Sequence, residues 1–420
     1  MSKIRITNFG PIKEGYLEND GWIDIKKVTV FIGNQGSGKS TVAKLISTFT
    51  WMEKALTRGD YDIKAFEKED VLHKYLKYHK IEHYLTYPQK NKIGGIRDVS
   101  QIEYFGESYS FVYNKGFLKI KERSTSDYPL PQIMYVPADR NFLSSAEDLK
   151  TQRILSAALR EVLDEMDKAK NEIKEDLALP INNASLEYDR QKDVLYVKGK
   201  DYKIKLSESS SGFQSFVPLY LVTRYLTNLI NGQSETKEPM SSDELSRFRK
   251  GFADIYANDS LTDDQKRAAL SSLAAIFNKS AFINIVEEPE QNLFPTSQWE
   301  MLKSLLEFNN MNQGNKLIMT THSPYIMNYL SIAIEAGNLM YKIKSTVGTN
   351  ALRSKLNRII PEAALIQAND LVIYELNETD GTISKLSDFE GIPSDKNYLN
   401  MLLREGNQLF DSLLEIEEEL

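Results

Sequence analysis

The chain has 420 residues, a net charge of −7 at neutral pH and an isoelectric point near 5.5, so broad, non-specific adhesion to DNA is not expected, although a local basic patch is compatible with these totals. It contains no cysteine, which excludes disulfides and thiolate-bound zinc or iron–sulfur sites. Hydrophobic residues make up 41% of the chain, and no apolar run reaches the roughly 18 residues of a membrane span, so the sequence predicts a soluble cytoplasmic protein.

The first strong pattern lies at residues 28–41. The apolar run 28–32 predicts a buried strand, and a helical segment follows from residue 39. Between them the spacing G-x-x-x-x-G-K-[ST] is that of a phosphate loop, formed by Gly33, Asn34, Gln35, Gly36, Ser37, Gly38, Lys39, Ser40 and Thr41. Its glycines let backbone N–H groups turn toward phosphates. We therefore predict that Lys39 binds the β- and γ-phosphates and that Ser40 coordinates Mg²⁺.

The rest of the N-terminal part predicts a helix over 42–56 and another over 61–86. His79 and His83 lie four residues apart in the second helix and would share a face, which allows a metal pair. Because no third ligand is near, an exposed basic helix face is the favoured interpretation. Residues 104–121 predict a hairpin with its turn at residues 114–116.

A buried strand over 133–136 runs into Pro137-Ala138-Asp139-Arg140. This segment is equally compatible with a charged turn and with a catalytic role. Residues 146–178 predict the longest helix, with an apolar seam of 4-3-4-3-4 spacing, which fits packing against the body or docking of a partner. Residues 231–279 have the character of a helical insertion without recognisable chemistry.

Three further segments carry polar residues at positions that suit phosphate chemistry. Ser207–Gln214 forms a serine–glycine turn before an apolar helix, either as a structural cap or as an anion site. A core-type strand, 282–286, ends at Glu287 and Glu288, which suits one Mg²⁺-associated acid and one base that polarises water better than a solvated acidic turn. The strand 317–321 ends at His322, for which a γ-phosphate contact is favoured over a capping role.

The remaining part, 331–420, predicts a strand over 371–375, a turn at 380–381 and a helix from Tyr398 into an acidic end. It contains no evident catalytic cluster.

Five segments, taken in order, resemble the ABC-type ATPase heads of the SMC-like and OLD-like class. They are GNQGSGKST, PADR, SSSGFQ, FINIVEEPE and TTHSP. The resemblance implies an α/β fold, an ABC-type P-loop NTPase head with a mixed β-sheet core, flanking helices, an antiparallel β subdomain and helical insertions. It divides the chain into an N-terminal ATPase lobe (1–145), a helical and β insertion (146–206), a C-terminal ATPase lobe (207–330, with the insertion 231–279) and an α/β extension (331–420).

The same resemblance implies the roles of the site residues. Residues 33–41 correspond to Walker A, and Ser210–Gln214 to the signature, in which Ser211 and Gly212 would contact nucleotide. The catalytic residues would be Glu288, His322 and Lys39, the metal ligands would be Ser40 and Glu287, and Arg140 would lie at the nucleotide. Two departures are Phe213, where a second glycine is usual, and Glu287, where Asp is commoner.

The function implied is an ATP-binding and ATP-hydrolysing switch that uses Mg²⁺ and forms a homodimer or higher homo-oligomer. The absence of a long coiled-coil arm favours the stand-alone ATPases of bacterial phage defence, which control a separately encoded effector, such as a Toprim-type nuclease, and respond to a phage trigger protein. An SMC-like DNA repair ATPase and the ATPase subunit of a transporter are the alternatives. Nucleic-acid binding stays open, and no membrane partner is expected.

Overall fold

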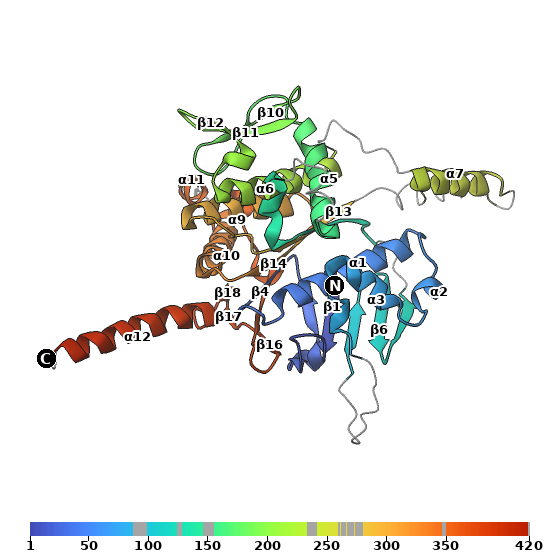
Figure 1. Ribbon diagram of the computed structural model, residues 1–420, viewed down its shortest axis with the longest axis horizontal. Coiled ribbons are helices and arrows are strands. Elements are labelled where there is room, and N and C mark those ends of the chain that lie inside the picture. The colour runs from blue at the N-terminus through green and yellow to red at the C-terminus, as the bar shows by residue number, and fades with distance from the viewer. Residues whose placement is uncertain are drawn as a thin grey trace, which may run out of the picture.

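The computed structural model describes residues 1–420 apart from 87–98, 124–127, 146–154, 233–241, 259–260, 262–265, 267–272, 274–279, 347–349 and 419–420. Its centre is a seven-stranded mixed sheet (Figure 1). In spatial order its strands are β2 (Gly15–Tyr16), β16 (Thr382–Lys385), β15 (Leu371–Leu376), β4 (Val28–Gly33), β14 (Lys316–Thr321), β13 (Ala281–Glu287) and β8 (Pro131–Val136).

The five strands from β15 to β8 are parallel, so their carboxyl ends meet at one edge of the sheet. Their register aligns Gly33 with Leu376, Ile32 with Thr321, and Glu287 with Thr320. Segments far apart in the chain are thereby brought to a common edge, which is where open α/β sheets bind ligands.

Neighbouring residues of the central strands enter two different cores because side chains alternate across a sheet. Phe31 and Ile285 pack on the face covered by α1 (Lys39–Thr57), whereas Ile32 and Val286 pack on the opposite face. The opposite face is covered by α5 (Ala157–Asn171), α6 (Ser211–Ile230), α9 (Pro295–Asn310) and α10 (Pro324–Lys344). Burial on both faces explains why these strands are predominantly apolar without the alternation of a half-exposed strand.

Two antiparallel sheets flank the central one. The first contains β3 (Ile23–Ile25), β1 (Ser2–Thr7), β5 (Gln101–Phe105), β6 (Tyr109–Asn114) and β7 (Phe117–Glu122), and the second contains β12 (Lys203–Lys205), β11 (Val194–Lys198), β10 (Ser185–Asp189) and β9 (Leu177–Ala178). The hairpin expected in the first is confirmed: β6 and β7 pair around Lys115 and Gly116, both at positive φ.

The helix expected over 61–86 is wrong. The segment forms α2 (Ile63–Phe66), α3 (Val71–Leu76) and the 3-10 turns η2 (Lys77–His79) and η3 (Glu82–Tyr84), because Asp70 and Lys80 adopt left-handed backbone conformations that interrupt a helix. His79 is buried against Tyr135, so the interpretation as an exposed basic face is also wrong for this residue. Among the described residues, no cluster of three or more metal-ligating side chains occurs.

The helix expected over 146–178 is shorter in the structure. Its described part, α5, begins after the N-cap Ser156 and ends at Asn171, and residues 177–178 already form β9; residues 146–154 lie outside the described part. The apolar seam, with Leu159, Val162 and Met166 at its centre, is buried in the core, so packing against the body is confirmed. Of the insertion 231–279, the structure describes chiefly α7 (Ser242–Tyr256).

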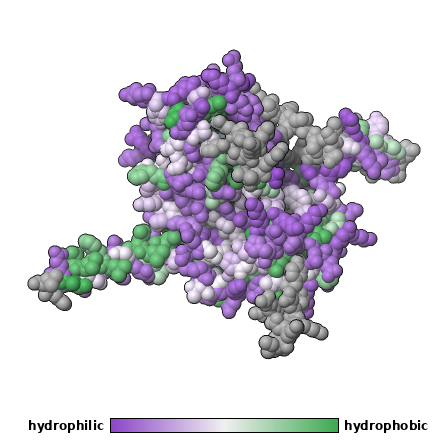
Figure 2. Space-filling model, viewed as in Figure 1, coloured by the Kyte–Doolittle hydropathy of each residue, from purple (hydrophilic) through white to green (hydrophobic). Residues whose placement is uncertain are grey.

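The last part of the chain returns to the sheet and then leaves it. It contains α11 (Asn350–Ile359), the short strands β17 (Asp388–Phe389) and β18 (Ile392–Pro393), and α12 (Tyr398–Glu418). The remaining 3-10 turns are η1 (Asn19–Gly21), η4 (Ala138–Ser145), η5 (Leu206–Glu208), η6 (Glu362–Ala364) and η7 (Ala368–Asp370). Helix α12 projects from the body (Figure 1), and its surface is strongly hydrophobic (Figure 2). Within the described ranges, no helix is both long enough and apolar enough to span a membrane.

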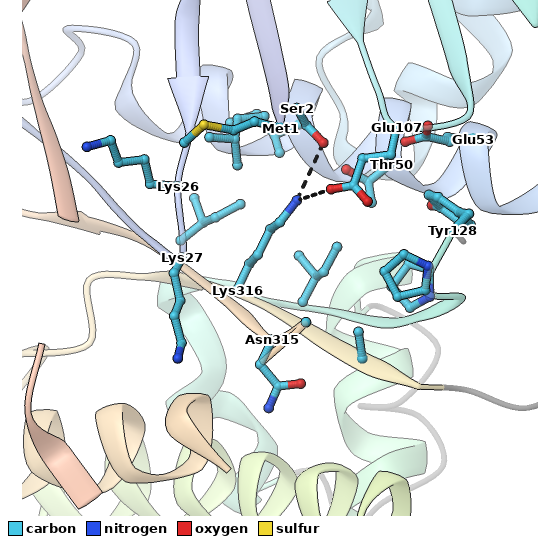
Figure 3. A pocket seen from close by; sticks show the side chains of 18 of the residues that line it. Met1, Ser2, Lys26, Lys27, Thr50, Glu53, Glu107, Tyr128, Asn315 and Lys316 are labelled. Atoms are coloured by element: carbon cyan, nitrogen blue, oxygen red, sulfur yellow. Dashed lines mark hydrogen bonds and ion pairs between the residues drawn. The ribbon is translucent and has the colours of Figure 1, made fainter. Parts of the chain in front are cut away.

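At the opposite edge of the sheet, a cavity of about 260 Å³ contains charged side chains (Figure 3). Lys316 Nζ lies 3.1 Å from Glu107 Oε1, beside the buried Glu53 of α1. Glu53 accepts hydrogen bonds from the backbone N–H groups of Ser108 (2.6 Å) and Tyr109 (3.1 Å). Burial nevertheless raises the pKa of Glu53 to about 7, because desolvation disfavours its charged form.

Glu53→Gln is expected to stabilise the protein at alkaline pH. A carboxyl whose pKa is raised on folding costs no stability below the unfolded pKa; the cost grows as the pH rises from the ordinary pKa of 4.5 to about 7 and is constant above that. The variant should exceed the wild type by up to roughly 3 kcal/mol at about pH 8 and match it at about pH 4. Urea unfolding at both pH values, with the exposed Glu122→Gln as control, measures this difference. A difference that does not change with pH would contradict the prediction.

Candidate functional site

The phosphate loop connects β4 to α1 at the carboxyl edge of the sheet. Gly33, Gly36 and Gly38 have φ values of 141°, 78° and 103°, a region that side chains disfavour. At Gly33 a Cβ atom would lie 2.3 Å from the carbonyl oxygen of Leu376, so the neighbouring strand β15 leaves room only for glycine. Local sequence and tertiary packing therefore require the same loop conformation.

Lys39 is the buried cation of this loop. Its Nζ donates hydrogen bonds to the carbonyl oxygens of Gly33 (3.0 Å) and Asn34 (2.7 Å). Burial lowers the pKa of Lys39 to about 8, although nearby carboxylates, Glu288 first among them, oppose the shift. The hydroxyl oxygen of Ser37 is buried without a hydrogen-bond partner. A bound phosphate would supply an acceptor to both side chains, so the loop fits the predicted ligand.

Glu287 ends β13 with a buried carboxylate. It accepts a hydrogen bond from the Tyr135 hydroxyl and one from the Ala138 N–H at 3.1 Å, and Lys44 Nζ lies 3.8 Å away. It shares a cavity of about 490 Å³ with Ser40. A carboxylate and a hydroxyl beside a phosphate site are oxygen donors of the kind that Mg²⁺ takes together with phosphates and water. The predicted Mg²⁺ therefore fits these residues, and its coordination by Ser40 and Glu287 stays a prediction.

Glu288 follows in a turn that holds its carboxylate toward the same cavity. Its φ is +42°, and its N–H donates to the carbonyl of Thr320 at 2.9 Å. Its Oε1 lies 3.4 Å from Nε2 of His322. The hydrogen bond from His322 lowers the pKa of Glu288. An ionised carboxylate at neutral pH is the form that a general base requires.

Glu290 is a site residue that sequence reasoning missed. Its carboxylate accepts hydrogen bonds from the Thr321 hydroxyl (2.8 Å) and from the His322 N–H (2.7 Å), which fixes the backbone that carries the histidine. Burial raises its pKa above the usual range. The signal was present in the sequence, since the segment reads Glu-Glu-Pro-Glu, but only the first two carboxylates were given roles.

The structure corrects the nucleotide-binding role predicted for Arg140. The residue is fully buried and does not line the cavity that contains Lys39. Its guanidinium donates to the carbonyl oxygens of Glu287 (2.7 Å) and Glu288 (2.8 Å), and also to those of Pro289, Ser215 and Pro137. Arg140 therefore supports the turn that carries the two glutamates, from a buried position outside the cavity.

The signature residues lie apart from this cavity. Ser211 is exposed at the first turn of α6 and Gly212 is partly exposed, and neither residue lines the cavity. Gln214 closes the turn by donating to the carbonyl oxygens of Ser207 and Ser209, each at 2.9 Å. At Gly212 a Cβ atom would lie 3.0 Å from the carbonyl of Asn292. The N-terminus of α6 is thus exposed to solvent, and its contact with nucleotide stays a prediction.

The loop also contacts the C-terminal extension, which was not foreseen. Asn34 Nδ2 donates to Glu378 Oε1 at 2.8 Å, across 344 residues of sequence. Glu378 also accepts a hydrogen bond from Tyr398, the first residue of α12. The hydrogen bond from Asn34 is the largest cause of a lowered pKa of Glu378, and the hydrogen bond from Tyr398 lowers it further. One carboxylate therefore joins the phosphate loop to the start of α12.

Comparisons with known proteins fit this geometry. A model of the AAA ATPase domain family matches residues 266–327, a stretch that contains both site glutamates and His322. The cell division ATP-binding protein FtsE of Bacillus subtilis (strain 168) is 38% identical over 69 residues, which make up 16% of this chain and 29% of that protein. The chain thus spans less than a third of the length of that relative.

The solved structures that match this chain include ATPase heads and transporter cassettes, at low TM-scores. The SMC head domain from Thermotoga maritima is 12% identical, with 92% of this chain and 98% of that chain covered and a TM-score of 0.36. A dimeric bacterial ABC transporter cassette is 11% identical, with 93% and 100% covered and a TM-score of 0.22. The α/β part of the predicted fold class is confirmed by the structure itself, since a mixed sheet with flanking helices carries a phosphate loop between β4 and α1. The assignment to the ABC-type heads stays a prediction.

ATP binding is expected to take up a proton at alkaline pH. With a pKa of about 8, Lys39 is largely neutral at about pH 9 in the free protein, and phosphate charges would raise its pKa and restore the proton. Calorimetric titrations in buffers of different ionisation enthalpy should give an uptake of more than half a proton per ATP at about pH 9. Lys39→Arg, which stays charged, is the matched control and should show no uptake. Equal heats in all buffers for the wild type would contradict the assignment.

Proposed function

We propose that the chain is an ATP-binding and ATP-hydrolysing conformational switch of ABC type. The observation that carries this proposal is the single cavity that brings together Lys39, Ser40, Glu287, Glu288 and His322. A phosphate-binding loop alone would suit any nucleotide-binding protein. The ionised carboxylate of Glu288, held beside a histidine at the same cavity, adds a group that can accept a proton from an attacking water.

Each residue has a separate task in this proposal. Lys39 and the loop N–H groups bind the β- and γ-phosphates, and Glu288 orients and deprotonates the attacking water. His322, which is 3.4 Å from Glu288, holds that carboxylate in place and contacts the γ-phosphate. Mg²⁺ bound at Ser40 and Glu287 would neutralise charge on the phosphate oxygens. Arg140 and Glu290 act by positioning the turn and the histidine.

Glu288→Gln is expected to bind ATP but to hydrolyse it roughly 10² to 10⁴ times more slowly, the usual contribution of a positioned general base. Single-turnover hydrolysis and nucleotide-binding assays separate the two steps. Lys39→Ala is the companion variant and should lose binding itself, whereas Glu287→Gln should raise the Mg²⁺ concentration that hydrolysis requires. If Glu287→Gln and Glu288→Gln exchanged these effects, the assignment of metal ligand and base would be reversed.

We further propose that each ATP site is composite, with Ser211 and Gly212 supplied by a second protomer. The exposed N-terminus of α6 would close the open side of the cavity with a hydroxyl and N–H groups. Within one chain these two residues stay outside the cavity that contains Lys39, so a second chain is needed to bring them to the nucleotide. One chain offers one phosphate loop and one signature, and a two-fold dimer would therefore contain two such sites.

The composite site can be tested by mixing subunits. Lys39→Ala and Ser211→Arg homodimers should each be inactive, because each lacks one half of both sites. Heterodimers of the two variants should regain about half of the activity, since both lesions then fall in one pocket and the other pocket is intact. Heterodimers isolated by two affinity tags and assayed for turnover provide the measurement. A monomer that hydrolyses ATP at the full rate would rule out a shared site.

For the biological role, we propose that this ATPase holds a separately encoded effector, such as a nuclease, in bacterial antiviral defence and releases it when a phage trigger protein is sensed. The motif order, which also resembles that of the ATPase of the PARIS defence system, supports the proposal.

The polar face of α5 is a poor candidate for the effector surface, because its carboxylates already have partners within the chain. Glu161 accepts a hydrogen bond from the Tyr78 hydroxyl, and the buried Glu165 accepts one from Lys168. Co-expression with neighbouring genes, followed by purification, tests for an effector, and DNA-stimulated hydrolysis would favour the DNA repair alternative instead.

A further inference from the structure

Helix α12 carries an apolar surface that the rest of the described chain leaves uncovered. Of its residues Tyr398–Glu418, Leu399 is buried at the start, and every residue from 401 to 418 is exposed. The helix stands away from the body in Figure 1, and hydrophobic residues follow it outward in Figure 2. A contiguous apolar surface of this kind marks an interaction site in a soluble protein.

The apolar residues form one continuous stripe. Eight large apolar side chains along the helix are between 43% and 70% exposed: Met401, Leu402, Leu403, Leu409, Phe410, Leu413, Leu414 and Ile416. Positions 402, 406, 409, 413 and 416 repeat with the 4-3-4-3 spacing of helices that pack along each other, and Leu403, Phe410 and Leu414 form a row directly beside them. Arg404, Asp411 and Glu415 lie on the opposite face, whereas Glu417 lies in line with the stripe at its C-terminal end.

We infer that α12 pairs with the α12 helix of a second copy of this chain, in antiparallel orientation. The first argument is shape. Gly406 lies in the middle of the stripe, where an added Cβ atom would meet nothing within 4 Å, and Phe410 lies one turn further along the same face. The stripe therefore contains one gap and one large ring next to each other.

An antiparallel pair matches these two features to each other. When two α12 helices cross at the level of residue 408, Phe410 of each copy lies opposite Gly406 of the other. The same alignment places Leu402 opposite Leu414 and Leu403 opposite Leu413. A parallel, in-register pair would place Gly406 opposite Gly406 and leave a void at the centre, which is unfavourable in a packed interface.

The second argument is charge. The last turns of α12 carry Glu415, Glu417 and Glu418, whereas the cation of the helix, Arg404, lies near its start. A parallel pair would bring the two acidic ends together, and the antiparallel pair separates them along the helix. The same carboxylates disfavour DNA and anionic membranes as the surface that covers the stripe.

The start of α12 is firmly attached to the body, so pairing would also fix how two bodies are oriented. The N–H of Tyr398 donates to Glu375 Oε1 at 2.5 Å, at the end of β15, and Leu399 is packed in the core. An antiparallel pair is isologous, because each copy uses the same surface. This interface is independent of the proposed function, since it uses no residue of the nucleotide site.

The first test measures the mass of the full chain without nucleotide, by sedimentation over a range of concentrations, in a Lys39→Ala background that excludes a nucleotide-dependent dimer. We expect an assembly of two copies, or of an even number of copies. The double variant Leu409→Glu, Leu413→Glu should raise the dissociation constant at least 100-fold. Gln408→Glu, Ser412→Glu, which adds the same charge to the polar face, should leave it nearly unchanged. A monomeric starting protein, or equal effects of both double variants, would overturn the inference.

The second test determines the orientation, and the absence of native cysteine makes it direct. Leu403→Cys and Leu413→Cys chains, distinguished by a size tag, are mixed and oxidised. The antiparallel pair predicts the mixed 403–413 disulfide as the main product. A predominance of 413–413 disulfides would indicate a parallel pair and overturn the proposed arrangement. Absence of all cross-links in chains that remain dimeric would place the interface outside α12.

Discussion

The arrangement of the site depends on one buried cation. Arg140 follows β8, and its guanidinium donates hydrogen bonds to carbonyl oxygens of the turn 287–289 after β13 and of Ser215 in α6. It therefore ties three segments together that are separated by 75 to 149 residues. The turn it supports holds Glu288 at φ +42°, a conformation that persists in a non-glycine residue only when its surroundings enforce it.

Burying this charge is costly in principle, and the surroundings show how the cost is reduced. Desolvation lowers the pKa of Arg140 to about 10, so the side chain is still protonated at neutral pH. The groups to which it donates are backbone carbonyl oxygens, which are themselves costly to bury without a donor. The carboxylates Glu287, Glu288 and Glu290 supply the opposing charge nearby. Removing the guanidinium would thus leave several polar groups unsatisfied at once, directly beneath the proposed base.

The sequence predicted those parts of the fold and site that local patterns determine. The strand before Gly33, the loop and the start of α1 are encoded within about fourteen residues by apolar, glycine and cationic positions. The strands that end at Glu287 and at Thr321, just before His322, were recognisable because both faces of the sheet are buried. Parallel pairing then brought these ends together.

The sequence-based predictions that were wrong or missing concern features that depend on partners distant in the sequence. Arg140 was placed at the nucleotide because nothing local shows that its partners are carbonyl groups. The segment 61–86 contains helix-forming residues, yet Asp70 and Lys80 take left-handed conformations that packing imposes. The contact between Asn34 and Glu378 spans 344 residues and had no signal at all.

That last contact gives the C-terminal extension a physical connection to the nucleotide site. Asn34 lies in the phosphate loop, and its carbonyl accepts a hydrogen bond from Lys39, while its side chain donates to Glu378. A phosphate that draws Lys39 away from this carbonyl would remove one of the hydrogen bonds that hold Asn34. Because Glu378 also bonds Tyr398, the change reaches the first residue of α12 through one carboxylate. The nucleotide site and the first residue of α12 are therefore joined by a continuous chain of hydrogen bonds, from Lys39 through Asn34 and Glu378 to Tyr398.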